Sequence, residues 1–149
     1  MSKHQKIGTF DIETDPFAAG RKVLIPFCTD FFDGETHYTF WGKSCMRRVS
    51  EIMLDFDGII YAHNGGKFDF HFLLSHLPDD VKIFCIRNRI ATLKANKVEF
   101  RDSFLIIPTG LAKFGNKIEL DYSKLEADVR DKHREEILRY LKQDTAGLY

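Results

Sequence analysis

The stretch Phe10-Asp11-Ile12-Glu13-Thr14 is a hydrophobic strand interrupted by two acidic residues that lie two positions apart. Because side chains alternate faces along a β-strand, we expect Asp11 and Glu13 to point to one side and Phe10 and Ile12 to the other. Two carboxylates held side by side repel each other unless a cation lies between them, and such oxygen ligands suit Mg²⁺ or Mn²⁺. An acid pair at a strand end is also typical of a solvated surface or a helix cap, so this stretch alone leaves both interpretations open.

The composition is that of a well-packed globular protein. The chain has 149 residues, of which 44% are apolar and 30% are charged, and we expect one domain over residues 1–149 with a core of its own. Lys plus Arg equal Asp plus Glu at 22 each, so a polyanion would have to be held by a local basic patch. The sequence has no run of 18 apolar residues and no basic-then-apolar leader, which predicts no membrane contact and an intracellular location.

The cysteines and the basic residues each suggest a simple interpretation. The three cysteines are far apart and show no Cys-x-x-Cys spacing, so we expect reduced thiols and no zinc site. One segment is rich in basic residues and is a candidate nucleic-acid patch, although such residues also protect the exposed edge of an antiparallel sheet. These residues are Lys82, Arg87, Arg89, Lys94, Lys97 and Arg101.

Hydrophobic periodicity and turn signals predict strands first, then alternating strands and helices, and a closing helix. The internal Pro26 indicates a bulged or edge strand, Asp33-Gly34 a hairpin turn, and Ser44 a helix cap. This order indicates an α/β or α+β domain around one mixed sheet. The predicted strands are residues 6–14, 23–32, 35–41, 58–62, 81–86, 90–95 and 98–104, and the predicted helices are residues 44–55, 67–77 and 131–149, with a short helix starting within 106–111.

A buried strand ends at the polar, glycine-rich turn that begins with Asn64 and leads into a helix at Asp69. The end of such a strand and the start of the following helix form a place where ligands bind. There Asp69 could ligate a metal, Asn64 could bind a sugar or phosphate, and Phe68 could stack on a base. The alternative is an ordinary turn in which Phe68 is a core residue and Asp69 favours the helix dipole.

The closing helix places Tyr140 and Asp144 on one face, because residues four apart are neighbours on a helix. The phenol could orient an attacking water while the carboxylate ligates a metal. Alternatively, Tyr140 packs with its polar tip at the surface and Asp144 faces solvent.

Taken in order, Asp11-x-Glu13, Asn64-x-x-x-Phe68-Asp69 and Tyr140-x-x-x-Asp144 resemble the three exonuclease motifs of family B DNA polymerases. They look most like those of the protein-primed polymerases of phages and linear plasmids. The resemblance extends over essentially the whole chain. It implies an RNase H-like α/β fold, with a mixed sheet flanked by helices, and a proofreading-type 3′–5′ exonuclease that removes nucleotides from single-stranded DNA ends with two divalent ions, Mg²⁺ or Mn²⁺.

The resemblance also implies roles for individual residues. Asp11 would bridge both ions, Glu13 and Asp144 would complete the first site, Asp69 would support the second through water, and Tyr140 would position the nucleophilic water. A catalytic lysine is expected shortly before an Asp-Tyr pair, which fits Lys117, with Lys113 as the fallback. The positions that match residues gripping the terminal nucleotides are Thr14, His63, Asn64, Phe68, Ser103 and Phe104.

The chain departs from the family pattern in two respects. No palm motifs of the polymerase follow within the 149 residues, so we expect no polymerisation from this stretch. It is either an excised proofreading domain, with a polymerase domain or subunit as its partner, or a free-standing relative. An extra glycine lengthens the second motif relative to some relatives, which leaves the contact of Asn64 open. The alternative functions are a catalytically weak nucleic-acid-binding or polymerase-associated module and an exonuclease that trims RNA 3′ ends.

Overall fold

The structure, a computed structural model, describes residues 4–16, 23–108 and 120–149. Within these residues, seven strands form one mixed sheet in the order β3-β2-β1-β4-β7-β6-β5. The central strand β1 pairs antiparallel with β2 and parallel with β4, so the expected α/β architecture around one mixed sheet is confirmed. The strands are β1 (Lys6–Thr14), β2 (Pro26–Phe32), β3 (His37–Trp41), β4 (Gly58–Ala62), β5 (Lys82–Ile86), β6 (Arg89–Ala95) and β7 (Val98–Asp102).

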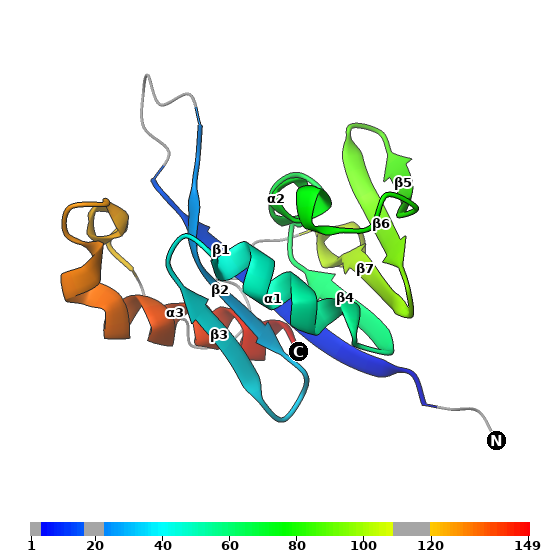
Figure 1. The fold of residues 1–149 in the computed structure, drawn as a ribbon, viewed down its shortest axis with the longest axis horizontal. Coiled ribbons are helices and arrows are strands. Elements are labelled where there is room, and N and C mark those ends of the chain that lie inside the picture. The colour runs from blue at the N-terminus through cyan, green and yellow to red at the C-terminus, as the bar shows by residue number, and fades with distance from the viewer. Residues whose placement is uncertain (1–3, 17–22, 109–119) are drawn as a thin grey trace.

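Helices cover both faces of the sheet. The helices α1 and α2 lie on one face and α3 lies on the other (Figure 1). Among the described residues, no helix is long and apolar enough to span a lipid bilayer. The α-helices are α1 (Cys45–Leu54), α2 (Asp69–Leu73) and α3 (Arg134–Leu148), and shorter 3₁₀ segments run over Leu74–His76, Ser103–Leu105, Tyr122–Leu125 and Arg130–His133.

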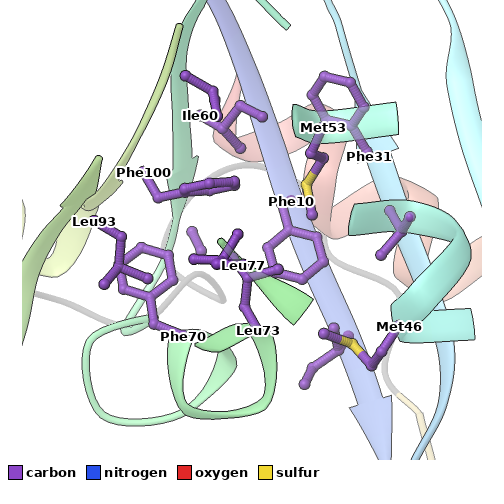
Figure 2. Packing of buried hydrophobic residues seen from close by; sticks show 14 of the residues in the cluster. Phe10, Phe31, Met46, Met53, Ile60, Phe70, Leu73, Leu77, Leu93 and Phe100 are labelled. Carbon is purple, nitrogen blue, oxygen red and sulfur yellow. The ribbon is translucent and has the colours of Figure 1, made fainter. Parts of the chain in front are cut away.

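The larger of two hydrophobic clusters lies between the sheet and the α1 and α2 layer, and a smaller one includes Ile137 and Leu141 of α3. Figure 2 shows Phe10 of β1 among side chains from α1, α2 and the neighbouring strands. Phe10 and Ile12 are 1% and 3% exposed, and both belong to this cluster. Since side chains alternate along β1, burial of these two residues turns Asp11 and Glu13 toward the opposite face, where α3 packs.

A polar network fixes α3 against β1 and β2. Thr9 Oγ1 donates a 2.7 Å hydrogen bond to the carbonyl oxygen of Thr145, and Thr145 Oγ1 donates a 2.5 Å bond to Asp30 Oδ2. Asp30 is completely buried, and its carboxylate also accepts a 2.7 Å bond from Thr39 Oγ1 and lies 2.7 Å from His37 Nδ1. A buried carboxylate with this many partners sets the position of α3 along the sheet, because sliding the helix would leave the charge unpaired.

Local turn chemistry follows the sequence closely in the first half of the chain. Asp33 Oδ1 accepts hydrogen bonds from the backbone of Glu35 and Thr36 in the turn between β2 and β3. The pairing register of β1 and β2 shifts between Glu13 and Thr14, and Pro26 is the residue opposite Thr14. The bulge predicted from the proline is therefore confirmed, whereas β2 is not an edge strand but lies between β1 and β3.

Three predictions about helices were wrong in detail. Ser44 precedes α1 but its side chain makes no capping bond, because its backbone has φ −93° and ψ 7° instead of the extended conformation of a capping residue. The predicted helix over residues 67–77 is α for residues 69–73 only and tightens to 3₁₀ up to His76. Leu77 precedes Pro78 and is extended, as steric conflict with the proline ring requires. In the predicted 131–149 helix, α geometry begins at Arg134.

The glycine turn after β4 requires the absence of a side chain at Gly66. A Cβ there would clash with the carbonyl oxygen of Ile90 and crowd the Asp102 carboxylate, which accepts a 3.1 Å bond from the Gly66 N–H. We expect Gly66→Ala to lower the free energy of unfolding by about 2 kcal/mol, because the clash involves backbone that cannot rotate away. Urea denaturation measures this change.

Gly147→Ala is the matched control, since Gly147 lies in α3 and a Cβ there meets no atom within 4 Å. It should leave stability unchanged or raise it by about 0.5 kcal/mol through helix propensity. Equal effects of the two substitutions would contradict the packing assigned to the turn.

Candidate metal centre

Three of the four predicted acids converge at the contact between β1 and α3. Asp11, Glu13 and Asp144 each offer a carboxylate oxygen, and these three oxygens all lie within 4.8 Å of one another. Asp11 and Glu13 point from one face of β1. Asp144 comes from α3, where it directly precedes Thr145, and the hydrogen bonds of Thr145 fix the helix on the sheet. Residues from opposite ends of the chain therefore meet in one acidic cluster.

Asp69, the fourth predicted acid, is the first residue of α2 and is 3% exposed. Its Oδ1 atom is buried and has no hydrogen-bond partner among the described residues. Burial is the main reason that the pKa of Asp69 is raised to about 7, and the hydrogen bonds from its own backbone and from Ile12 offset only part of that effect. The structure thus places a buried, incompletely satisfied carboxylate beside the acidic cluster.

The electrostatics of Asp11 connect Asp69 to the other acids. Burial raises the pKa of Asp11 well above its ordinary value, and the charges of Asp69, Glu13 and Asp144 raise it further. The hydrogen bond from the Ile12 N–H to Asp11 Oδ1, 3.0 Å long, acts in the opposite direction. Four carboxylates that repel one another in a partly dry site form an environment that favours a cation.

The donor set fits a hard divalent cation. All four candidate ligands are carboxylates, and oxygen donors of this kind suit Mg²⁺ or Mn²⁺ better than softer metals. The unpartnered Oδ1 atom of Asp69 is a further acceptor that a cation or its bound water would satisfy. The residues therefore fit the metal that the sequence predicts.

Tyr140 lies one helical turn before Asp144 and is 5% exposed, so its phenol is directed inward rather than to the surface. Burial, followed by the charge of Asp144 and a hydrogen bond with Tyr122, raises the pKa of Tyr140 well above its usual value. The phenol therefore stays protonated at neutral pH. Tyr140 therefore presents a hydroxyl, not a phenolate, beside the acidic cluster.

A pocket of about 320 Å³ opens next to the acids, and Glu13 forms part of its wall. Thr14 and Phe68, both predicted to contact a nucleic-acid end, line it as well. Tyr122 and Leu125 also line the pocket. No sequence pattern predicts roles for these two, because their segment is far from the three motifs and Tyr122 belongs only to the Asp-Tyr pair that marks the expected lysine.

The second motif meets β7 and the residues that follow it. His63 Nδ1 lies 3.0 Å from Ser103 Oγ, and the rings of His63 and Phe104 are 5.6 Å apart. Asn64, with φ 60°, accepts a 2.8 Å hydrogen bond from Arg89. The predicted set His63, Asn64, Ser103 and Phe104 is therefore brought together at one end of β4 and β7.

Arg89 was predicted as part of a basic surface patch, but its charge is used within the fold. Its guanidinium is 2.6 Å from the buried Asp102 carboxylate, lies 4.5 Å from the centre of the Phe104 ring and bonds Asn64. Arg101 likewise pairs with Glu99 at 2.9 Å. Two of the six cations of the predicted patch are therefore paired within the fold. Asp102 lies on a different strand from Arg89, so that pair could not be deduced from the sequence, whereas Glu99 and Arg101 are two residues apart on β7.

The predicted catalytic lysine is not among the residues that the structure describes. Lys117 and its fallback Lys113 lie outside the described residues, so their placement stays a prediction. Asp121, which follows them, is exposed and caps the Tyr122–Leu125 segment by accepting a 3.0 Å bond from the Ser123 N–H.

Comparison with known proteins gives sequence relatives among DNA polymerases. The family described as DNA polymerase type B, organellar and viral, matches residues 51–149. The DNA-directed DNA polymerase of Enterobacteria phage PRD1 is 41% identical over 146 residues, which cover 97% of this chain and 26% of that polymerase. A DNA polymerase of Kluyveromyces lactis is 34% identical over 95 residues, which cover 53% of this chain and 10% of that protein.

Solved structures with the same fold are those of Phi29 DNA polymerase. Its ternary complex with primer-template DNA and incoming nucleotides matches with a TM-score of 0.74 and 17% identity, over 97% of this chain and 30% of that one. Its complex with single-stranded DNA matches with a TM-score of 0.73 and 16% identity, over 96% of this chain and 30% of that one. The chain therefore spans about a third or less of the length of these proteins, and the shared fold confirms the expected RNase H-like α/β architecture.

The raised pKa of Asp69 leads to a prediction about stability and pH. Asp69 binds its proton more tightly in the folded than in the unfolded chain, so the metal-free protein should lose stability as the pH rises from 3.8 toward 7. The loss should be on the order of a few kcal/mol, and Mn²⁺ should reverse it at pH 7 by binding only the folded cluster. Urea denaturation in EDTA and in Mn²⁺ measures both effects.

Asp69→Asn is the control for this pH dependence, because it keeps the side-chain shape without the titrating group. It should reduce the decline between pH 4 and pH 7, leaving the part that Asp11 contributes, and be more stable than the parent at pH 7 without metal. An unchanged slope in this variant would contradict the assignment of the decline to Asp69.

Proposed function

The chain belongs to the family of organellar and viral type B DNA polymerases, and we propose that it is the unit of such a polymerase that removes nucleotides from DNA 3′ ends. The observation that carries the proposal is the convergence of Asp11, Glu13 and Asp144, with the buried carboxylate of Asp69 beside them. A pocket adjoining Glu13 supplies room for a terminal nucleotide. A cluster in which three carboxylates raise the pKa of a fourth is typical of a functional site rather than of a structural one.

The proposed reaction is hydrolysis of the last phosphodiester bond. A water oxygen bonds to phosphorus, the bond from phosphorus to the 3′ oxygen of the preceding nucleotide breaks, and the water proton is transferred to that leaving oxygen through solvent. Divalent ions, when bound, would lower the pKa of a coordinated water and neutralise charge on the leaving oxygen. Asp11, Glu13, Asp69 and Asp144 are the residues that would hold two such ions.

Tyr140 positions the attacking water. Its phenol is buried beside Asp144 and keeps its proton, so it donates a hydrogen bond and fixes where the water oxygen points. Lys117 is proposed as the catalytic lysine on its spacing from Asp121 and Tyr122.

The substrate is proposed to be a single-stranded DNA end. Phe68 lines the pocket that adjoins Glu13, where an unstacked terminal base can lie on an aromatic ring, and Thr14 offers a hydroxyl on the same wall. His63, Asn64, Ser103 and Phe104 supply polar and aromatic groups next to this pocket for the preceding nucleotide. A base paired in a duplex would have to separate before it could enter.

Residues 1–149 are proposed to act as one domain beside a polymerase domain or subunit. Support comes from the sequence relative, a DNA-directed DNA polymerase of which this chain covers 26%. In that setting the chain would correct errors during DNA replication.

The proposal predicts that Asp11→Ala combined with Asp69→Ala abolishes metal-dependent degradation. The double variant should hydrolyse a 5′-labelled single-stranded DNA at least about 10³-fold more slowly than the parent in Mg²⁺ or Mn²⁺, because both ion positions lose a ligand. Gel analysis of the shortened products measures the rate, and circular dichroism checks the fold.

Asp55→Ala combined with Asp57→Ala is the matched control, since these acids are exposed and lie at the opposite end of β4 from Asn64. Parental activity in the Asp11 and Asp69 variant would refute the site. Binding of strands without any hydrolysis by the parent would indicate the binding-only module, and faster hydrolysis of an RNA of the same sequence would indicate an RNA exonuclease.

A second prediction concerns the water-positioning role of Tyr140. Tyr140→Phe removes only the hydroxyl, so kcat should fall by about 100-fold while KM and Mn²⁺ affinity stay close to the parent. Steady-state hydrolysis and Mn²⁺ calorimetry separate these quantities. A loss of Mn²⁺ affinity equal to the loss of rate would assign the tyrosine to the metal site instead.

A further inference from the structure

A second pocket, of about 530 Å³, lies beside the second motif, and of its wall residues only Phe104 has been given a role so far. Its wall includes Lys67, Arg87, Asn88, Arg89, Phe104 and Leu105. Lys67 lines this pocket while the next residue, Phe68, lines the pocket beside the acids. The two pockets are therefore neighbours that share one turn of the chain.

The second pocket carries positive charge that no ion pair among the described residues neutralises. Arg89 also lines the pocket but is neutralised by Asp102, with Phe104 against its guanidinium. Lys67 and Arg87 are exposed, and among the described residues neither forms an ion pair. On a chain with no net charge, two free cations at one pocket provide a local attraction for a polyanion.

The backbone at Arg87 provides a second, independent observation. Arg87 and Asn88 form the two-residue turn between β5 and β6, in which Ile86 pairs with Arg89. Arg87 has φ 56°, a conformation in which glycine is strongly preferred and an arginine is strained. Backbone strain of this kind clusters at ligand-binding sites, and here the strained residue lines the pocket.

The remaining wall offers aromatic and apolar surface. Phe104 borders the pocket next to His63, and Leu105 is 42% exposed. Cations that alternate with an aromatic ring are the combination that holds the backbone and bases of a single strand without reading its sequence.

We propose that the pocket lined by Lys67 and Arg87 binds backbone phosphates of the DNA strand on the 5′ side of the end that reaches the acidic cluster. The inference rests on the proposed function, because it needs a strand whose 3′ end occupies the neighbouring pocket. The pocket acts as an anchor that holds a strand of several nucleotides in line with the site. A dinucleotide is too short to use it.

Arg87→Gly separates the effect of Arg87 on DNA binding from its effect on stability. Glycine relieves the strained φ, so the melting temperature should rise by about 3 °C. If Arg87 binds phosphate, the same variant should bind a 5′-fluorescein-labelled (dT)12 about 5-fold more weakly in EDTA by fluorescence anisotropy, although its fold is more stable.

Combining Arg87→Gly with Lys67→Ala gives a quantitative readout. The logarithm of the DNA-binding constant falls as the logarithm of the salt concentration rises. Each lost phosphate contact should make this slope shallower by about 0.7, so the slope of the double variant should be shallower by about 1.4. In Mn²⁺, the ratio of kcat/KM for (dT)12 to that for the dinucleotide should fall about 10-fold or more. Lys82→Ala is the matched control, since Lys82 is an exposed lysine on the same hairpin and is not part of the pocket.

The outcomes separate this inference from the proposed function. If the parent hydrolyses (dT)12 but the two substitutions leave the salt slope and the length ratio unchanged, the anchor is refuted while the nuclease proposal stands. If the parent hydrolyses nothing but the variants lose strand binding and salt slope, the anchor stands and the nuclease proposal fails. Equal losses with Lys82→Ala would refute a specific anchor in favour of a general effect of positive charge.

Discussion

The docking of α3 on β1 and β2 is the contact on which the acidic cluster depends. Thr145 joins the helix to both strands, through its carbonyl oxygen to Thr9 and through its hydroxyl to the buried Asp30. The next residue toward the N-terminus is Asp144, and Tyr140 lies one turn further back. A helix displaced along the sheet would unpair a buried charge, so the same network that holds α3 also delivers a carboxylate and a phenol to β1.

The two faces of β1 have opposite effects on stability. One face contributes Phe10 and Ile12 to the core, and the other presents acids that raise the pKa of Asp11 by mutual repulsion. Asp69 is buried with an oxygen atom that has no hydrogen-bond partner among the described residues, which further destabilises the fold. Apolar burial on one face of the central strand thus offsets the repulsion that a cation-binding site requires on the other.

Local patterns in the sequence predicted most of the fold, because alternation, turns and helical spacing involve only near neighbours. The β1 alternation, the Asp33 turn and the bulge at Pro26 all follow from such patterns. The convergence of Asp144 with Asp11 could be inferred only from the order of three motifs, since no periodicity connects a first strand with a last helix. The pairing of Arg89 with Asp102 and the wall formed by Tyr122 depend on how distant segments pack, so neither could be predicted from residue spacing.

Thr9 and Thr145 are connected by a hydrogen bond although they are 136 residues apart in the sequence. A site built from the first strand and the last helix has a high contact order, and such long-range closure comes late in folding because its loop entropy must be overcome first. During synthesis on the ribosome, the β1 carboxylates would therefore exist long before their helical counterpart emerges. The chain acquires its full set of acids only when α3 docks on β1.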